Sequence, residues 1–281
     1  MSGGRAMQID EGAAVGTGAP SKAVRDFEAG LVRRKVLVYV CQLAFGVLFL
    51  AFWQWASGRL IDPFFVSSPS AVFGKLYTWL LNGELVRHLS ITLYATAIGF
   101  LIGSAIGFAL GLIFGKFAFL AEVLDPYITA LYSIPKLALA PLFIIWFGIG
   151  IESKIAVSAS IVFFVVFLNT FSGVREVNPI YIHATQIMGA SQWGVMRTVI
   201  IPSATAWVIT GLKVSVPYAL VGTVIGEFMS ANRGIGFIIA QATGLFDTNS
   251  VFAGIIILAV VGAIINGLLK VTEGWLLRWR S

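Results

Sequence analysis

The sequence predicts an all-α polytopic membrane protein with about six transmembrane helices. Of its residues, 58% are hydrophobic and only 11% are charged, whereas soluble domains carry about 25% charged residues. Several segments are also long enough, with almost no charge, to cross a bilayer core, which takes about 20 apolar residues. A transmembrane β-barrel would need alternating segments of about ten residues, and these apolar segments do not alternate.

Six apolar segments are predicted to span the lipid bilayer, and two of them contain prolines. The predicted spans are residues 36–56, 89–114, 124–147, 153–173, 203–229 and 250–271. Since proline cannot continue the hydrogen bonding of a helix, we expect kinks or breaks in the third span at Pro135 and Pro141 and in the fifth at Pro217.

Lysine and arginine predict the orientation of these spans, because they are more frequent on the cytoplasmic side. With the N-terminus inside, the cytoplasmic flanks hold Arg33, Arg34, Lys35, Lys116, Arg175, Arg197, Lys270, Arg278 and Arg280. The outer loops then hold fewer, namely Arg59, Lys75, Arg87, Lys154 and Arg233. Both termini are therefore predicted to be cytoplasmic. Since these basic residues flank apolar segments, they indicate topology and no binding of nucleic acid.

The sequence predicts four consecutive parts of the chain. Residues 1–30 are rich in glycine, alanine and serine and are predicted to be a flexible cytoplasmic tail. Residues 31–84 contain the first transmembrane helix and an amphipathic helix at the outer interface, capped near Ser70. Residues 85–272 form the main transmembrane domain, and residues 273–281 form a basic cytoplasmic C-terminus.

The second predicted span carries a glycine at every fourth residue. This spacing keeps the glycines on one ridge of the helix, where another helix can approach the backbone closely. The ridge predicts tight helix packing and comprises Gly99, Gly103, Gly107, Gly111 and Gly115.

No constellation of residues predicts an enzyme, a cofactor or a metal site. The chain has one cysteine and two histidines, and His88 and His183 are predicted on opposite sides of the membrane. "GLIFGKF", residues 111–117, lacks the first glycine and the Ser/Thr of a phosphate-binding loop.

Three charged residues fall inside predicted spans, where a charge is costly. Lys136, Lys213 and Glu227 are therefore candidates for lining a transport pathway. Lys213 and Glu227 lie too far apart along one helix to pair with each other. The alternative is that each snorkels to the interface or pairs with another helix.

An amphipathic segment, "HATQIMGASQWGVMRTVIIP" (183–202), lies in the predicted cytoplasmic loop. Residues of about 178–188 can form a short helix, which Gly189 ends with a tight turn and after which Ser191 caps the next helix. Pro202 marks the start of the fifth span or a kink in it. The alternative is an ordinary interfacial helix that binds no partner.

This segment resembles the EAA loop of permease subunits of binding-protein-dependent ABC importers. Ala184, Gly189 and Pro202 match the family pattern at the required offsets, whereas His183 and Thr185 replace Glu and Ala. "SIPKLALAPLFIIWFGIG" (133–150), "FLNTFSGVREVNP" (167–179) and "VFAGIIILAVVG" (251–262) are similar to the branch that handles nitrate, sulfonates, taurine and bicarbonate. The similarity extends over about residues 60–280.

The resemblance implies a type I ABC-importer permease in the bacterial inner membrane, with residues 85–272 as its permease domain. It implies a second permease copy, separate cytoplasmic ATPase subunits and an outer solute-binding protein, with a small solute of anionic type as cargo. It also implies that the loop contacts the ATPase through His183, Ala184, Thr185, Gly189, Ala190, Ser191 and Pro202. The alternatives are a secondary transporter driven by an ion gradient, a membrane enzyme and a passive channel.

Overall fold

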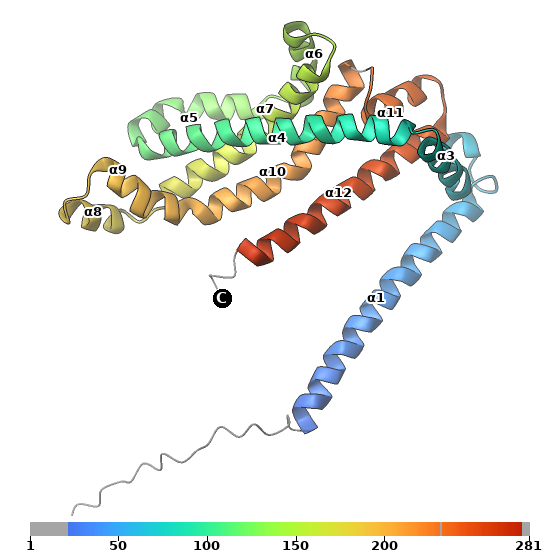
Figure 1. Ribbon diagram of the computed structural model, residues 1–281, viewed down its shortest axis with the longest axis horizontal. Coiled ribbons are helices and arrows are strands. Elements are labelled where there is room, and N and C mark those ends of the chain that lie inside the picture. Colours follow the sequence, from blue (N-terminus) through green and yellow to red (C-terminus); the bar gives the residue numbers. More distant parts are fainter. Residues whose placement is uncertain (1–21, 231, 277–281) are drawn as a thin grey trace, which may run out of the picture. The chain divides into compact units, whose positions relative to one another are not determined.

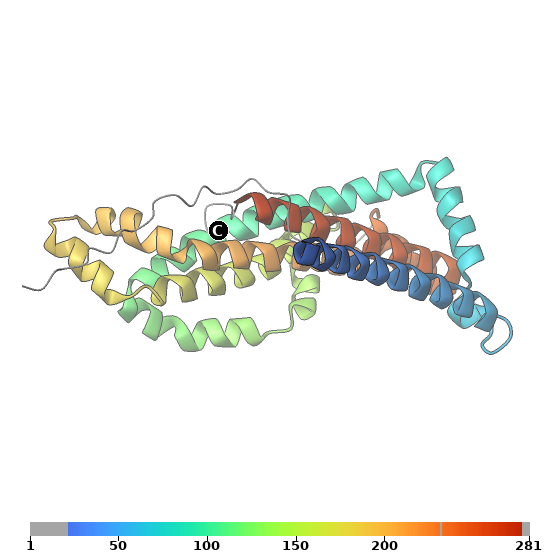
Figure 2. The same ribbon diagram turned by 90° about the horizontal axis from the view of Figure 1, so that it is seen from below.

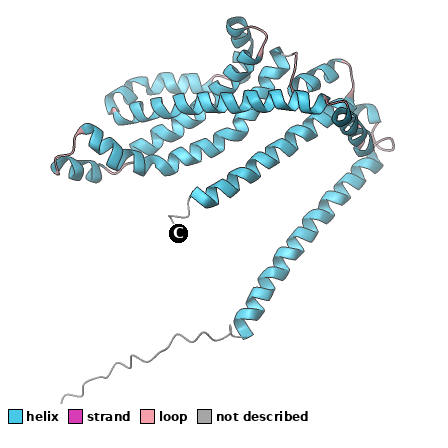
Figure 3. Ribbon diagram, viewed as in Figure 1, coloured by secondary structure: helices cyan, strands magenta, loops and turns pink. Residues whose placement is uncertain are grey.

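The structure, a computed structural model, describes residues 22–230 and 232–276. Regular secondary structure among these residues is helical, and none of them belongs to a β-strand (Figure 3). Five helices are long and apolar enough to cross a membrane, or six if a sharply bent helix pair is counted as one span. The predicted all-α polytopic fold is therefore confirmed. The chain divides into two compact units, Met1–Trp55 and Ala56–Ser281.

The first unit contributes one described helix, α1 (Lys22–Ala56). Its part from Arg33 to Ala56 is long and apolar enough to span a membrane, in agreement with the first predicted span. The helix already begins at Lys22, inside the segment 1–30 that was predicted as a tail. Most residues from 22 to 30 are adequate helix formers, and extending an existing helix costs far less than nucleating a new one. Residues 1–21 lie outside the described part of the chain.

Three long helices form the centre of the second unit: α4 (Glu84–Lys116), α7 (Ile151–Arg175) and α10 (Ile201–Ser230). Both α4 and α10 pack extensively along α7, and Figure 1 shows the three helices running alongside one another. A residue of α7, Ser158, is fully buried between its two neighbours. The core of this unit therefore follows the length of α7.

Glycines set the short distance between these helices. A Cβ added at any glycine of the predicted ridge on α4 would lie 2.5–2.7 Å from an atom of α7; these positions are Gly99, Gly103, Gly107, Gly111 and Gly115. On α10, a Cβ at Gly222 would lie 2.8 Å from the Cα atom of Ser158. Because a Cβ atom does not fit at such distances, only glycine allows these backbones to approach so closely.

A break divides the third predicted span into α5 (Ala118–Ser133) and α6 (Lys136–Phe147), which are bent by 90°. Ile134 has an extended backbone, with φ −65° and ψ 126°, as expected for the residue before a proline. The break predicted at Pro135 is therefore confirmed. By contrast, α10 continues as a helix through Pro217, so the fifth span is not broken at its proline.

The remaining helices of the second unit are α2 (Pro63–Val66), α3 (Pro69–Leu81), α8 (Pro179–Ile187), α9 (Gln192–Val195), the π-helical η1 (Met196–Ile200), α11 (Ile235–Gly244) and α12 (Thr248–Leu276). Figure 1 shows α8 and α9 at one end of α4 and α10, and α3 and α11 at the other. Figure 2 shows the same separation, with α8 and α9 in yellow and α3 in cyan. The two ends of this unit are therefore built from different short helices.

The helix α3 is tied to the start of α12. Its N-cap is Ser68, whose hydroxyl accepts a hydrogen bond from the N–H of Ala71 at 3.3 Å, so the cap lies two residues before the predicted Ser70. Lys75 forms an ion pair with Asp247 at 3.2 Å. Burial raises the pKa of Asp247, but hydrogen bonds from Ser250 and Lys75 outweigh burial and hold this pKa below its ordinary value.

Candidate functional site

Residues 176–202, which we call the α8–α9 segment, connect α7 to α10 and contain the loop singled out from the sequence. The first short helix, α8, starts after Asn178, whose side-chain oxygen accepts a hydrogen bond from the N–H of Ile180 at 2.9 Å. Pro179 occupies the first helical position, where its missing N–H would have no partner in any case. The short helix predicted near residues 178–188 is therefore confirmed.

A left-handed turn and a serine cap join α8 to α9. Gly189 has φ of +85°, which glycine adopts at much lower cost than other residues. Two residues later, the hydroxyl of Ser191 accepts a hydrogen bond from the N–H of Gly194 at 3.1 Å and so caps α9. Both local features follow the prediction from the sequence. They fix the direction in which α8 leaves the bundle.

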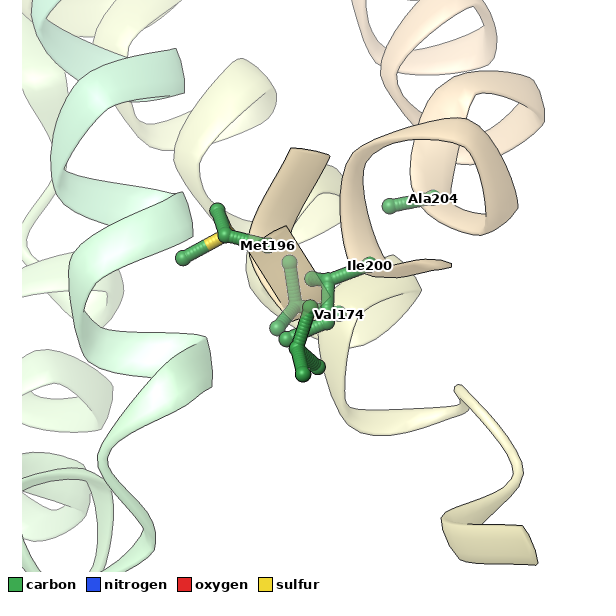
Figure 4. Packing of buried hydrophobic residues seen from close by; sticks show 5 residues of the cluster. Val174, Met196, Ile200 and Ala204 are labelled. Carbon is green, nitrogen blue, oxygen red and sulfur yellow. The ribbon is translucent and has the colours of Figure 1, made fainter. Parts of the chain in front are cut away.

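One face of the α8–α9 segment is anchored in the bundle. A cluster of buried residues comprises Val174, Val195, Met196, Ile200 and Ala204 (Figure 4), and Ile182 and Ala190 pack against it. Since Val174 belongs to α7 and Ala204 to α10, the segment is attached to both long helices. The segment is therefore packed against both of these helices at its base.

The other face of the segment exposes large apolar side chains. Ile187 and Met188 are 87% and 86% exposed, and Ile180, Tyr181 and Trp193 are also exposed. Large exposed apolar side chains are typical of a surface that contacts another protein or a membrane. We call these five side chains the apolar patch.

The residues that match or depart from the family pattern occupy this segment. His183, Ala184 and Gly189 are exposed, whereas the hydroxyl of Thr185 donates to the carbonyl oxygen of Tyr181 at 2.8 Å within α8. Ala190 is half-buried against the anchoring cluster.

Pro202 lies just after a π-helical turn. In η1 (Met196–Ile200) the N–H of Ile201 donates to the carbonyl oxygen of Met196, five residues earlier. Proline has no N–H, and its ring would clash with the carbonyl four residues before it in a regular α-helix. The wider turn relieves that clash where the segment joins α10. Pro202 therefore sits at an irregular junction between the segment and α10.

Lys136 lines a cavity of about 510 Å³ at the break between α5 and α6, together with residues of α7 and α10. Its ammonium group donates hydrogen bonds to the carbonyl oxygens of Leu131 at 2.7 Å and Tyr132 at 3.2 Å. It also lies 4.0 Å from the ring centroid of Phe164. Lys136 thus satisfies carbonyl groups at the end of α5 while its charge stays at the cavity wall.

Lys213 lines a second cavity, of about 420 Å³, between α10 and α12. Val214 and Tyr218 line both cavities, so they separate the two lysines. Glu227 lines neither cavity: it is 1% exposed near the end of α10. The structure therefore places Lys136 and Lys213 on neighbouring cavities and Glu227 outside both of them.

Glu227 belongs to a buried polar cluster that the sequence did not reveal. Its carboxylate accepts hydrogen bonds from the hydroxyl of Thr92 at 2.9 Å and from the N–H of Gly236 at 2.8 Å. Nearby, Lys154 is 2% exposed, and its ammonium donates to the carbonyl oxygen of Arg233 at 2.5 Å. Lys154 was predicted in an outer loop, because it lies near the edge of an apolar segment. The pair Gly234 and Gly236 was the local sign of a close approach.

These features define a class of protein. A bundle of membrane-length helices, with a broken helix pair beside a cavity, is typical of a membrane transport protein. Comparison with known proteins identifies the family.

The family model described as "Binding-protein-dependent transport system inner membrane component" matches residues 99–277. The match covers more than half of the chain, which therefore belongs to this family and is an ABC importer permease of the inner membrane. The resemblance inferred from the loop is thus confirmed. Permease components of ABC importers are not enzymes.

Relatives with known names span nearly the whole chain. It is 34% identical over 249 residues to the putative aliphatic sulfonates transport permease protein SsuC of Bacillus subtilis, covering 88% of this chain and 90% of that protein. It is 34% identical over 238 residues to the riboflavin transport system permease protein RibX of Chloroflexus aurantiacus, covering 84% and 88%. It is 31% identical over 253 residues to the taurine transport system permease protein TauC of Escherichia coli, covering 88% and 94%.

Solved structures share the fold at lower identity. An inward-facing conformation of the MetNI methionine ABC transporter matches with a TM-score of 0.59 and 19% identity, over 66% of this chain and 93% of that chain. An amino acid ABC transporter crystallised with histidines matches with a TM-score of 0.56 and 20% identity, over 70% and 96%. These similarities show that the bundle has the fold of an ABC transporter permease.

Proposed function

We propose that this permease forms the path for a small anion and binds a separate ATPase through the loop at residues 183–202. The observation that carries the proposal is the α8–α9 segment, which exposes an apolar patch on one side and is anchored to α7 and α10 on the other. A segment that is exposed on one side and packed against α7 and α10 on the other can transmit a movement of its partner to these helices.

Each loop residue has a role in this proposal. The exposed His183 and Ala184 face the ATPase together with the apolar patch, and Thr185 stabilises α8 from within. Gly189 and Ser191 aim the helix, Ala190 fixes it to the cluster, and Pro202 shapes its junction with α10. These assignments are supported by exposure, by caps and by packing.

The partners follow from the side on which the ATPase binds. ATP is cytoplasmic, so the α8–α9 segment and both termini lie in the cytoplasm, and the end that carries α3 and α11 faces outward. A solute-binding protein delivers cargo to that outer end, and a second copy of the permease completes the path.

The proposed cargo is an anion of the nitrate, sulfonate, taurine or bicarbonate type. Two cations, Lys136 and Lys213, line neighbouring cavities beside α10, and relatives are named for aliphatic sulfonates and taurine. An ammonium group in a cavity of low polarity attracts an anion more strongly than it would in water.

A flat heteroaromatic solute is the second candidate. Three aromatic residues, Tyr132, Phe164 and Tyr218, line the cavity at Lys136, and aromatic rings stack favourably on flat ligands. The relatives RibX and ThiX are named for transport of riboflavin and formylaminopyrimidine. Uptake of radiolabelled taurine by cells carrying the complete transporter, with nitrate, bicarbonate and riboflavin as competitors, separates the two candidates.

Replacement of Gly189 tests the binding of the ATPase. Gly189→Val places a β-branched residue at φ of +85°, which costs roughly 1–2 kcal/mol and redirects α8. We expect at least a tenfold loss of ATPase recovered with the tagged permease. Gly83→Val is the matched control, because Gly83 has φ of +74° and an added Cβ at either position meets no atom within 4 Å.

Recovery of ATPase by Gly189→Val at the wild-type level, with unchanged taurine uptake, would show that the loop does not couple the two subunits. A variant of the phosphate-binding lysine in the partner ATPase tests the alternative of a secondary transporter. If uptake persists in that variant, an ion gradient and not ATP drives transport.

A further inference from the structure

The end of the bundle opposite the α8–α9 segment contains a helix whose first turn is capped by other helices. The residue before α11, Gly234, has no side chain to cap it and adopts φ of +122°. Instead, the N–H of Ile235 donates to the hydroxyl of Thr92 at 2.9 Å, and the N–H of Gly236 donates to the carboxylate of Glu227 at 2.8 Å. Thr92 belongs to α4 and Glu227 to α10, so α11 starts correctly only when these helices are aligned.

Two further side chains hold the turn that leads into α11. The N–H of Gly234 donates to Nδ1 of His88 on α4 at 3.0 Å. The ammonium of Lys154 on α7 donates to the carbonyl oxygen of Arg233 at 2.5 Å. All four side chains are buried, and we call them, namely His88, Thr92, Lys154 and Glu227, the α11 cap. The cap therefore draws on α4, α7 and α10 together.

Glycines allow the close approach of these helices, and there is no space for a Cβ atom at their positions. A Cβ added at Gly234 would lie 2.0 Å from Oε1 of Glu227, and one at Gly236 would lie 2.8 Å from its Cβ. On α10, a Cβ at Gly226 would lie 2.8 Å from the Cα of Lys154. Hydrogen bonds need a donor–acceptor distance of about 2.7–3.2 Å and weaken steeply when the angle at the hydrogen falls below about 120°. A slide of α10 against α4 or α7 thus breaks the cap.

The helix α10 connects this cap directly to the opposite end of the molecule. It begins at Ile201, next to the anchoring cluster of the α8–α9 segment, and carries Glu227 in its last turn. The helix is continuous from Ile201 to Ser230, through Pro217, and rises about 1.5 Å per residue. One helix thus joins the segment to the carboxylate that caps α11.

We propose that the α11 cap is a latch for the outer end of the path: it is closed in one of the two access states of the transporter and open in the other. This inference rests on the proposed function, since the ATPase supplies the displacement of α10. His88, Thr92, Lys154 and Glu227 act as positioning residues, because they hold α11 and do not contact the cargo.

Hydrogen exchange of the Ile235 and Gly236 amides tests the latch in the assembled transporter, in lipid nanodiscs. Exchange is compared without nucleotide and after trapping with ATP and vanadate, so no cargo is needed. We expect exchange of these amides to differ at least tenfold between the two states. Equal protection in both states would overturn the latch and leave a purely structural cap.

Substitutions identify the side chains that protect the amides of Ile235 and Gly236 from exchange. Thr92→Val removes the hydroxyl that caps Ile235, so exchange in the protected state should rise on the order of fivefold, as for the loss of one hydrogen bond. Thr96→Val is the matched control, because Thr96 is also buried on α4 but bonds to Thr92 and Thr223 and not to α11. An equal response to both substitutions contradicts the assignment. Glu227→Gln keeps a carbonyl acceptor for Gly236 and should change exchange less than Glu227→Ala.

The same measurement separates failure of the latch from failure of the proposed function. If amides of the α8–α9 segment respond to trapping but those of α11 do not, only the latch is wrong. If the ATPase does not assemble with the permease, or if the segment also fails to respond, the proposed function itself is wrong.

Discussion

At one end of the second unit, the α8–α9 segment exposes the apolar side chains of Ile187 and Met188; at the other end, α4, α7 and α10 bury the charged side chains of Lys154 and Glu227. Exposed apolar groups gain free energy when a partner covers them. Buried charges are costly and persist where geometry satisfies them. The first end therefore suits the proposed contact with the ATPase, whereas the side chains of the second end satisfy one another inside the bundle. Substitutions at the two ends should accordingly affect different quantities.

The largest expected difference concerns the loss of one side chain at each end. Glu227→Ala leaves the hydroxyl of Thr92 and the N–H of Gly236 without the carboxylate that they bond, and it removes the attraction of that carboxylate for Lys154. It should lower the free energy of unfolding by about 3 kcal/mol. Ile187→Ala should change that free energy by less than about 0.5 kcal/mol, because Ile187 is exposed.

Binding of the ATPase should respond in the opposite order, with the larger effect for Ile187→Ala and the smaller for Glu227→Ala. Ile187→Ala removes an apolar contact and should weaken ATPase binding on the order of tenfold. Denaturant unfolding in detergent and ATPase binding by titration provide the two measurements. The comparison of the two ends fails if Ile187→Ala destabilises the permease as strongly as Glu227→Ala.

Two glycines with positive φ provide a smaller difference. Gly234→Ala adds left-handed strain and a Cβ at 2.0 Å from Glu227, so we expect a loss of about 3 kcal/mol in unfolding free energy. Gly189→Ala adds strain alone, since nothing lies within 4 Å of the added Cβ, and should cost about 1 kcal/mol. Thermal unfolding of the two variants measures both effects. Similar shifts in both would show that the α11 end is no more tightly constrained than the loop.

The smallest expected effect concerns the ion pair of Lys75 with Asp247 beside α11. The pKa of Asp247 is held below its ordinary value, so the ionised carboxylate is stabilised in the folded protein. This contribution is fully present above the unfolded pKa, which is about 4, and is lost as the pH falls through the lower folded pKa. Both side chains are 35% exposed, so solvent screening limits the contribution to about 0.5 kcal/mol. Thermal unfolding from pH 6 to about pH 3 should show Asp247→Asn losing this pH dependence.

The sequence predicted the features that depend on neighbouring residues. Pro135 breaks the third span, and Gly189 and Ser191 shape the loop, because each acts through its own backbone or through residues three positions away. The glycine ridge indicated close packing, but α7 could be recognised as the partner helix only in the structure.

The α11 cap lay beyond sequence reasoning because its partners are distant along the chain. Thr92 and Glu227 are 135 residues apart, and His88 and Gly234 are 146 residues apart. Lys154 looks like a loop cation by position, but in the structure it is buried, and Gly226 of α10 packs closely against its backbone. The cavities beside Lys136 and Lys213 likewise depend on how α6, α7, α10 and α12 come together.

Cross-linking at Ile187 tests most directly whether the α8–α9 segment binds the ATPase. The chain has a single cysteine, Cys41, so Cys41→Ser provides a cysteine-free background for Ile187→Cys. Leu81→Cys is the matched control, because Leu81 is 68% exposed on α3 at the opposite end. With a short thiol-to-amine cross-linker, we expect a permease–ATPase product for Ile187→Cys and none for Leu81→Cys. A product of equal yield at both positions, or none at Ile187→Cys in the assembled transporter, would contradict it.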